Sequence, residues 1–278
     1  MITTQEIMER IKLPREAQIQ VNKQLLTEEE YNQKKKLFVE NGKEFFVQWK
    51  EKENRYQWIL TFYIQLACEV YEEYKKNGIS DEIFNDSFYD ITIWTEECHR
   101  KYNIWGLEEA EWLELTLKRK LFRLGRLQFE PIILEKEIRT KSKILEVGTQ
   151  VLNVHIPSGE KMDYEKCLES LKQAEIFFDR IYEGYVCDSW LLSPKLLDFI
   201  PENSNIARFQ RMFEIVEVHY KFPQAEQRIF NDIREDKENY PENTILQKKA
   251  KEYICAGNDI GIGIGFLALE KIKDNGKE

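Results

Sequence analysis

Hydrophobic residues recur at three- and four-residue spacing through roughly the first 120 residues, which is the period of an amphipathic helix. The segment "TEEEYNQKKKLFVENG" predicts a helix with Thr27 as N-cap, Glu30 completing a capping box and Gly42 as terminator. The segment "YQWILTFYIQLACEVYEEYKKNG" predicts a longer helix whose first half is apolar nearly all round, and therefore buried. Ser80 and Asp81 can cap a further helix. Residues 1–120 are thus predicted to form a helical N-terminal domain.

The period of the pattern changes after residue 120. The segments "LFRLGRLQFEP", "EKEIRTKSKILEVG" and "TQVLNVHIP" predict three short strands in an antiparallel meander. A helix from Asp163 to about Tyr182, a strand in "YVCDSWLLSP" ended by Pro194, and a helix in "NSNIARFQRMF" come next. "EIVEVHYKF" alternates as a strand, two helical stretches follow, and "DIGIGIGFLAL" predicts the last strand. We therefore expect an α/β (α+β) protein in which residues 121–278 form a mixed sheet with flanking helices.

Composition and charge narrow the classes of partner. The net charge of −9 over 278 residues argues against nucleic acid or an anionic membrane, because either needs a basic surface. The longest apolar stretch near a helix, "WILTFYIQLAC", is too short and too polar to span a bilayer, and the N-terminus has no signal-peptide pattern. The five cysteines include no CxxC pair, which favours reduced thiols in a soluble cytoplasmic protein. The three histidines have no zinc-site spacing, so we expect no metal.

The stretch "VLNVHIPSGEKMDYEKCLESL", residues 151–171, carries the first candidate chemistry. Its strand alternation places Val151, Asn153 and His155 on one face and a core-facing apolar set on the other. His155 lies near the end of the strand, where open α/β sheets bind ligands, and its imidazole is suited to act as a general base. The alternative is a histidine that is simply hydrogen-bonded to a neighbouring loop.

The turn after this strand has the form of an anion site. Ser158 and Gly159 precede a helix whose first-turn N–H groups attract phosphate, and glycine permits close approach of the backbone. The acidic residues Glu160, Asp163 and Glu165 oppose an anion there. Asp163 as an ordinary N-cap is the simpler explanation of the turn.

Two further patterns bear on function. Asp188 lies in the middle of a predicted strand and would orient the His155 imidazole if the two strands are adjacent; a structural role at the rim of the strand is the alternative. The glycines of "GIGIGFLA" match a dinucleotide pattern formally, but no helix and second strand can follow. They instead predict a strand whose glycine face is pressed against another backbone, a helix or a ligand.

The order of these elements resembles the GNAT (N-acyltransferase) fold. The segments "RLGRLQFEP", "VLNVHIPSG", "DSWLLSP", "NSNIARFQRMF" and "GIGIGFL" are similar to a bacterial family that joins a helical N-acyltransferase N-terminal domain to a GNAT-like C-terminal domain. The resemblance implies that the chain binds acetyl-CoA or another acyl-CoA as a cosubstrate. Its pantetheine arm would pair with a strand, residues 151–156, that splays from residues 186–192, and its pyrophosphate would lie on the loop 157–163.

The resemblance also implies site residues. The acyl-CoA contacts would be Val154, Ile156, Ser158, Gly159 and Trp190. In GNAT enzymes a carboxylate or a relayed water deprotonates an amine and a tyrosine protonates the leaving thiolate, which makes His155, Glu217 or His219 the base and Tyr220 the acid. The acceptor would be a small-molecule or peptide amine.

The family's usual phosphate loop reads Q/R-x-x-G-x-G/A, whereas this chain has "PSGEKMD". The leading hypothesis is therefore an acyl-CoA-dependent N-acyltransferase. The alternative is a non-catalytic GNAT-like module, a ligand sensor or a protein-interaction domain, in which the loop has lost phosphate binding.

Overall fold

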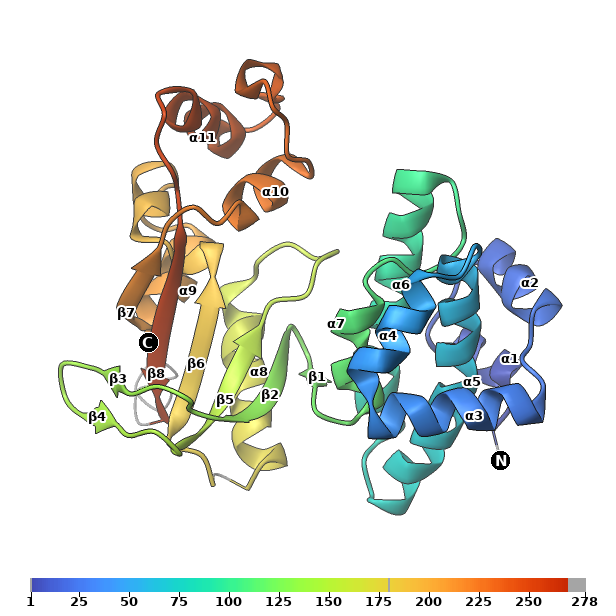
Figure 1. Ribbon diagram of the computed structural model, residues 1–278. Coiled ribbons are helices and arrows are strands. Elements are labelled where there is room, and N and C mark those ends of the chain that lie inside the picture. Colours follow the sequence, from blue (N-terminus) through green and yellow to red (C-terminus); the bar gives the residue numbers. More distant parts are fainter. Residues whose placement is uncertain (1, 180, 270–278) are drawn as a thin grey trace. The chain divides into compact units, whose positions relative to one another are not determined.

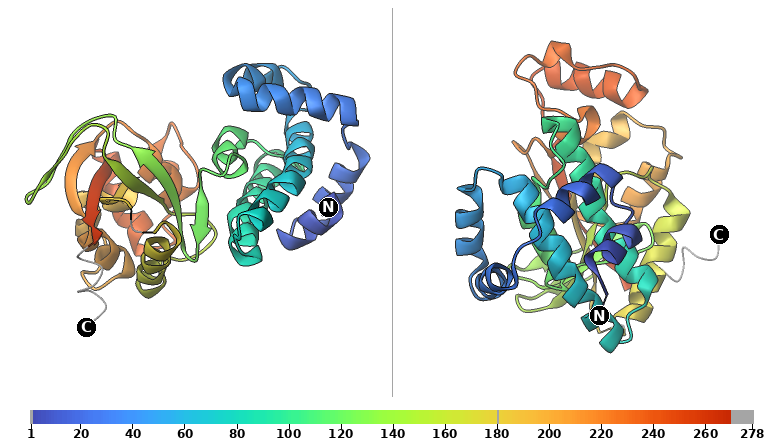
Figure 2. Two further views of the ribbon diagram at one scale, coloured as in Figure 1. Left: turned by 90° about the horizontal axis from the view of Figure 1, so that it is seen from below. Right: turned by 90° about the vertical axis from the view of Figure 1, so that its right-hand side faces the viewer.

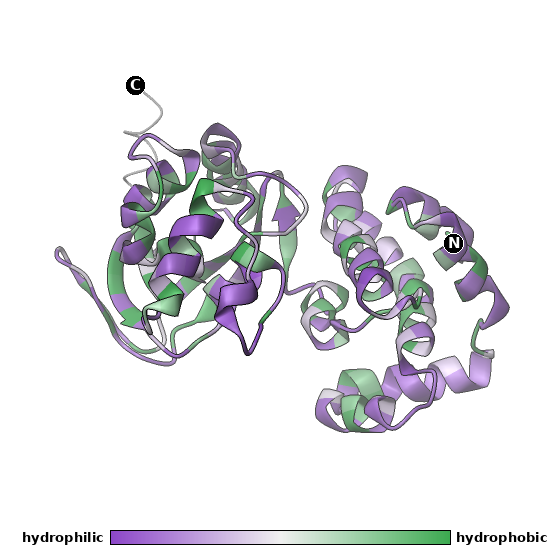
Figure 3. Cartoon of the chain, turned by 90° about the horizontal axis from the view of Figure 1, so that it is seen from above, coloured by the Kyte–Doolittle hydropathy of each residue, from purple (hydrophilic) through white to green (hydrophobic). Residues whose placement is uncertain are grey.

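The computed structural model describes residues 2–179 and 181–269. The chain divides into two compact units, Met1–Arg123 and Leu124–Glu278. Along the helices of both units hydrophobic and hydrophilic residues alternate, as expected of elements with one face packed on a core (Figure 3).

The described part of the first unit is helical up to its last residues (Figure 1). Thr27 and Ser80 are confirmed as N-caps, since their side chains accept hydrogen bonds from the N–H groups of Glu30 and Ile83. Gly42 does not end the helix before it: Asn41 is the cap residue, and Gly42 begins the next helix. The helices are α1 (Thr4–Arg10), α2 (Arg15–Lys23), α3 (Glu28–Glu40), α4 (Gly42–Lys50), α5 (Arg55–Lys76), α6 (Asp81–Tyr102) and α7 (Ala110–Leu117).

The core of the first unit is built around α5. The first half of this helix is buried on nearly every side, as its apolar sequence predicts. Phe62 of α5 packs against Phe38 and Phe45 with ring centroids 5.8 and 5.2 Å away. Aromatic pairs in this range of distances add to the free energy of burial, so the cluster holds α3 and α4 against α5.

The second unit is built on a six-stranded sheet in the order β1-β2-β5-β6-β8-β7 (Figure 1). β5 and β6 are parallel, and the pairs β2–β5, β6–β8 and β7–β8 are antiparallel, so the sheet is mixed as predicted. Its strands are β1 (Phe122–Leu124), β2 (Leu127–Ile133), β5 (Gln150–His155), β6 (Gly184–Ser189), β7 (Glu214–His219) and β8 (Ile262–Ala268).

The predicted three-strand meander is wrong in its middle strand. The segment "EKEIRTKSKILEVG" instead forms a separate two-stranded sheet from β3 (Ile138–Arg139) and β4 (Ile144–Leu145). β2 therefore pairs directly with β5. The charged residues that suggested a continuous strand are exposed or half-buried along this hairpin, and within the segment only Ile138 and Leu145 are buried.

Helices cover one face of the sheet (Figure 2). Asp163 is confirmed as the N-cap of α8 (Tyr164–Phe177), and Ser204 is the N-cap of α9 (Asn205–Met212). Between them the predicted strand in "YVCDSWLLSP" ends early: β6 stops at Ser189, whose side chain caps the 3₁₀ helix η1 (Trp190–Leu192), and η2 (Pro194–Asp198) follows. β7 likewise ends at His219, so the alternating segment after it is not part of the strand.

The glycines of β8 allow close packing on the helix-covered face. A Cβ on Gly263 would lie 2.2 Å from the carbonyl oxygen of Leu192, and one on Gly265 would lie 2.8 Å from side-chain carbons of Leu192 and Phe213. The predicted glycine face is therefore pressed against the η1 backbone and a side chain that follows α9.

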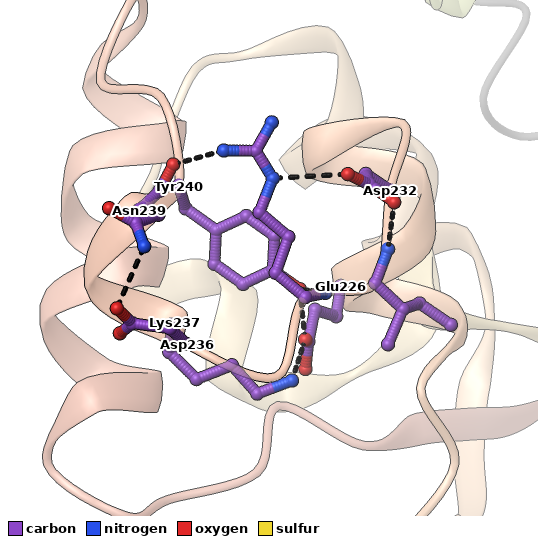
Figure 4. Close-up of polar contacts among 8 residues, drawn as sticks. Glu226, Asp232, Asp236, Lys237, Asn239 and Tyr240 are labelled. Carbon is purple, nitrogen blue, oxygen red and sulfur yellow. Dashed lines mark hydrogen bonds and ion pairs between the residues drawn. The ribbon is translucent and has the colours of Figure 1, made fainter.

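A small helical module joins β7 to β8. It comprises α10 (Gln224–Phe230), the 3₁₀ helix η3 (Lys237–Asn239) and α11 (Ile245–Cys255). Glu226 of α10 accepts hydrogen bonds from Lys237 Nζ and Tyr240 OH, which ties α10 to the η3 segment (Figure 4). Burial, and then the bond to Glu226, raises the pKa of Tyr240.

Three findings concern the described residues as a whole. No helix in residues 2–179 and 181–269 is long and apolar enough to cross a membrane. The same residues contain no group of three or more His, Cys, Asp or Glu side chains placed to hold a metal ion. All five cysteines are free thiols, and only Cys255 is exposed.

Candidate active site

The parallel pair of strands at the centre of the sheet diverges partway along its length. β5 and β6 are both described in full, and they pair only at Leu152–Tyr185 and Asn153–Val186. β5 continues to pair with β2 as far as His155, and β6 continues to pair with β8 as far as Ser189. The two halves of the sheet therefore open away from each other at the carboxyl ends of β5 and β6. Such facing strand edges can hydrogen-bond an extended ligand that carries amides.

Polar side chains gather on the sheet face opposite α8 and α9. Residues paired across neighbouring strands share a face, so the register places Glu130 and Asn153 together and aligns Asp188 with Glu217 through Ile264. Two histidine–carboxylate pairs result. His155 Nε2 lies 2.9 Å from Glu130 Oε2, and His219 Nε2 lies 3.3 Å from Glu217 Oε1.

The His155 pair is the more enclosed of the two. The side chains of His155 and Glu130 are 23% and 18% exposed, against 40% and 44% for His219 and Glu217. Asn153 Nδ2 lies 3.4 Å from Glu130 Oε2 and 3.1 Å from His155 Nε2. We assign the tautomer in which Nε2–H donates to Glu130, because a carboxylate can only accept. That tautomer leaves Nδ1 as the nitrogen able to take a proton.

Sequence reasoning named Asp188 as a partner for His155 and missed Glu130. β6 is adjacent to β5, as that hypothesis required, but the carboxylate at hydrogen-bonding distance from the imidazole is Glu130. Burial raises the pKa of Asp188, although the nearby side chains of His219 and Lys136 act in the opposite direction. Asp188 lies on β6 beyond its last pair with β5, at the opening between the two strands. Adjacent residues of a strand point to opposite faces, so the apolar Phe129 indicated that Glu130 lies on the face away from the core.

The remaining catalytic candidates lie at the far edge of the sheet. Glu217 Oε2 lies 2.6 Å from Lys136 Nζ, and this lysine lowers the pKa of Glu217. β7 is separated from β6 by β8, which places Glu217 and His219 about 10 Å from β6. Tyr220 lies beyond the end of β7 and is 61% exposed.

The predicted contacts for acyl-CoA lie on β5, on the loop that follows it and on η1. Val154 is buried on the helix-covered face, so only its backbone can meet a ligand in the opening. Ile156 and Trp190 follow the ends of β5 and β6, and both pack, half-buried, against an apolar cluster that includes Leu191. The backbone N–H of Trp190 donates to Oε1 of Gln224 at 2.8 Å. The opening between the strands therefore has apolar walls at its end.

In the loop after β5, Ser158 and Gly159 are exposed, and Gly159 has a φ of +92°. Two of the acidic side chains that were expected to repel an anion there form a hydrogen bond or an ion pair within the protein. Asp163 Oδ1 accepts from Lys166 N–H at 3.1 Å, and Glu165 lies 2.8 Å from a guanidinium nitrogen of Arg208. The repulsion expected from the sequence is therefore reduced.

A buried arginine, which sequence reasoning missed, holds the inner side of this loop. Arg126 is 4% exposed and lies between β1 and β2. Its guanidinium donates to the carbonyl oxygens of Pro157 at 3.0 Å, Glu160 at 2.9 Å and Lys161 at 3.3 Å. The only signal in the sequence was a charged residue between the apolar residues Leu124 and Leu127.

The divergent parallel strands and the loop-to-helix turn beside them define a GNAT-like domain. The family model of the GNAT-like C-terminal domain matches residues 121–267, and that of the N-acyltransferase N-terminal domain matches residues 2–118. The chain belongs to the GNAT-like acyltransferase family, as its sequence predicted. No curated protein matches this sequence.

Solved structures of an acyltransferase share the fold. One, in complex with decanoyl-CoA and teicoplanin, has 18% identity and a TM-score of 0.77, over 96% of this chain and 87% of that chain. A mutant acyltransferase in complex with octanoyl-CoA gives the same TM-score, identity and coverage. At this level of identity the likeness establishes the fold.

Proposed function

We propose that this protein is an acyl-CoA-dependent N-acyltransferase that transfers the acyl group to an amine. The observation that carries the proposal is the divergence of β5 and β6 beyond Leu152–Tyr185 and Asn153–Val186. Membership of the GNAT-like family supports it, and so do the complexes of the structurally similar acyltransferase with decanoyl-CoA and octanoyl-CoA.

The opening between the strands suits the donor. The pantetheine arm carries amides, which can hydrogen-bond to the backbone of Val154 and Ile156 along the edge of β5. Its pyrophosphate would meet the loop at Ser158 and Gly159, where the backbone is exposed before the N-terminus of α8. The half-buried Trp190 supplies an apolar wall for the arm or the acyl group.

His155 is the proposed base. It lies on β5, at the edge of the opening, whereas Glu217 and His219 lie on β7, two strand spacings beyond β6. Glu130 accepts from the imidazole, fixes its tautomer and stabilises the imidazolium that forms when Nδ1 takes a proton.

The reaction balances with these groups. The cationic amine first loses one proton to water. The neutral amine nitrogen then bonds to the thioester carbonyl carbon as Nδ1 of His155 takes a second proton from it, and strand N–H groups stabilise the oxyanion. The C–S bond then breaks, which gives an amide and the CoA thiolate. We propose Tyr220 as the acid that protonates the thiolate; since it lies beyond β7, the imidazolium of His155 is the competing proton donor.

The acceptor is proposed to be a small-molecule or peptide amine. Amines are cationic at neutral pH, and the same face of the sheet as His155 carries the carboxylates of Glu130 and, on the adjacent strand β6, Asp188. A cytoplasmic location, which the free cysteines favour, would supply both acyl-CoA and reducing conditions.

Thermal unfolding with and without CoA esters tests donor binding. A ligand present at a hundredfold its Kd stabilises the native state by about 2.7 kcal/mol, so acetyl-CoA, octanoyl-CoA or decanoyl-CoA is expected to raise the Tm by several degrees. Pantetheine without the nucleotide serves as the control and should shift the Tm less. The absence of a shift with all three esters would favour the non-catalytic module.

A further inference from the structure

We propose that Arg126 is a positioning residue that holds the loop 157–162 with the backbone N–H groups of Ser158, Lys161 and Met162 facing the pyrophosphate of acyl-CoA. The inference rests on the proposed function and explains how a loop without the family's usual glycines can still bind a diphosphate. Arg126 itself would not touch the ligand, because its guanidinium is buried behind the loop.

The orientation of the N–H groups follows from peptide geometry. In a trans peptide unit the C=O and N–H bonds point in opposite directions, and the described part of the chain has no cis peptide. The carbonyls of Pro157, Glu160 and Lys161 point at the guanidinium of Arg126. The N–H groups of the same three peptide units belong to Ser158, Lys161 and Met162, so they point away from it.

These three N–H groups are available to a ligand. Among residues 2–179 and 181–269, none of the three donates a hydrogen bond within the protein. Backbone N–H groups exposed on the outer side of a loop can donate to an anion, and the N-terminus of α8 follows directly. With Arg126 on the other side, the loop lies between a buried cation and the space that an anion would occupy.

Arg126 is itself held firmly. Its backbone N–H donates to Ser170 Oγ of α8 at 2.8 Å, and Ser170 Oγ donates to the carbonyl of Lys166 at 2.9 Å. Gly125, with a φ of +70°, permits this close approach, since a Cβ there would lie 3.1 Å from Ser170 Oγ. The turn, α8 and the loop are therefore fixed relative to one another through Arg126 and Ser170.

Donors with and without the pyrophosphate test the role of Arg126. For Arg126→Met, we expect the KM for decanoyl-CoA to rise about tenfold or more, because three charge-assisted hydrogen bonds to the loop are lost. The kcat/KM for S-decanoyl-pantetheine, which has no pyrophosphate, should change less than about twofold. Arg126→Lys should give an intermediate KM, because a lysine keeps the charge but not the planar set of donors.

Arg139→Met is the matched control. Arg139 lies on β3 with its side chain 71% exposed, so this variant removes the same charge without altering the loop, and its KM should equal that of the wild type. An equal loss with both donors in Arg126→Met would overturn the positioning role and leave a structural one. Wild-type protein that neither binds nor uses acetyl-CoA, octanoyl-CoA or decanoyl-CoA would overturn the proposed function, and this inference with it.

A second measurement does not depend on a folded variant. In wild-type protein labelled with ¹⁵N, CoA is expected to shift the amide resonances of Ser158, Lys161 and Met162 strongly, and pantetheine is expected to leave them nearly unchanged. Equal shifts with the two compounds, or no shift at these three amides with CoA, would contradict the inference.

Discussion

Replacing His155 with alanine is expected to lower kcat about a hundredfold, while the KM for acyl-CoA changes little. Loss of a general base costs about 10²–10⁴ in rate, and His155 acts on the amine rather than on the nucleotide of the donor. Glu130→Gln should lower kcat less, by about tenfold, because the neutral amide keeps a hydrogen bond to Nε2 but stabilises the imidazolium poorly. The measurement is the release of CoA thiol under saturating donor.

The variant His219→Ala tests whether the base lies on β5, as His155, or on β7, as His219. His219 has its own carboxylate partner, Glu217, but lies on the edge strand β7. If His155 is the base, His219→Ala retains most of the activity; a larger loss for His219→Ala than for His155→Ala would move the base to β7. A lower Tm for His155→Ala with kcat unchanged would mean that the imidazole is only a hydrogen-bonded part of the structure.

Gly263→Ala is expected to destabilise the second unit by about 3 kcal/mol or to prevent its folding. The added Cβ would lie 2.2 Å from the carbonyl oxygen of Leu192, and that oxygen belongs to the η1 backbone, which cannot move away as a side chain can. η1 begins directly after Ser189, the last residue of β6, so the displacement reaches the opening between β5 and β6. Urea unfolding followed by circular dichroism measures the change.

Gly257→Ala is the matched control within the same unit. Gly257 has a φ of +81°, and no atom lies within 4 Å of the position that a Cβ would take. The alanine variant should therefore cost only the strain of a left-handed residue, about 1 kcal/mol. Equal costs for the two variants would show that contact with Leu192 does not determine the stability of β8.

Local signals in the sequence predicted many of the elements. Thr27, Ser80, Asp163 and Ser204 cap helices because a short polar side chain before an apolar period satisfies free N–H groups, and that requirement is readable from a few residues. The ends of elements that depend on tertiary contacts could not be predicted from the sequence. β6 stops at Ser189 because η1 packs against the β8 glycines, a contact between segments more than 70 residues apart in the sequence.

The same distinction holds for the site. His155 could be found from strand alternation and from its place before a turn, since both are local features. Glu130 and Arg126 could not, because their roles depend on the register of β2 against β5 and on a loop about 30 residues further along the chain. The acidic residues of the loop suggested repulsion of an anion. The cap formed by Asp163 was readable from the sequence, but the ion pair of Glu165 with Arg208 emerged only from the fold.

The central claim is that this fold transfers an acyl group from CoA to an amine, and stoichiometry tests it most directly. Purified protein is incubated with decanoyl-CoA and a set of small-molecule and peptide amines; free CoA thiol is measured by colorimetry and the amide by mass spectrometry. We expect one amide to form for each CoA thiol released, at a rate about a hundredfold lower in His155→Ala. Thiol release without any amide, or no thiol release with any donor and amine, would contradict it.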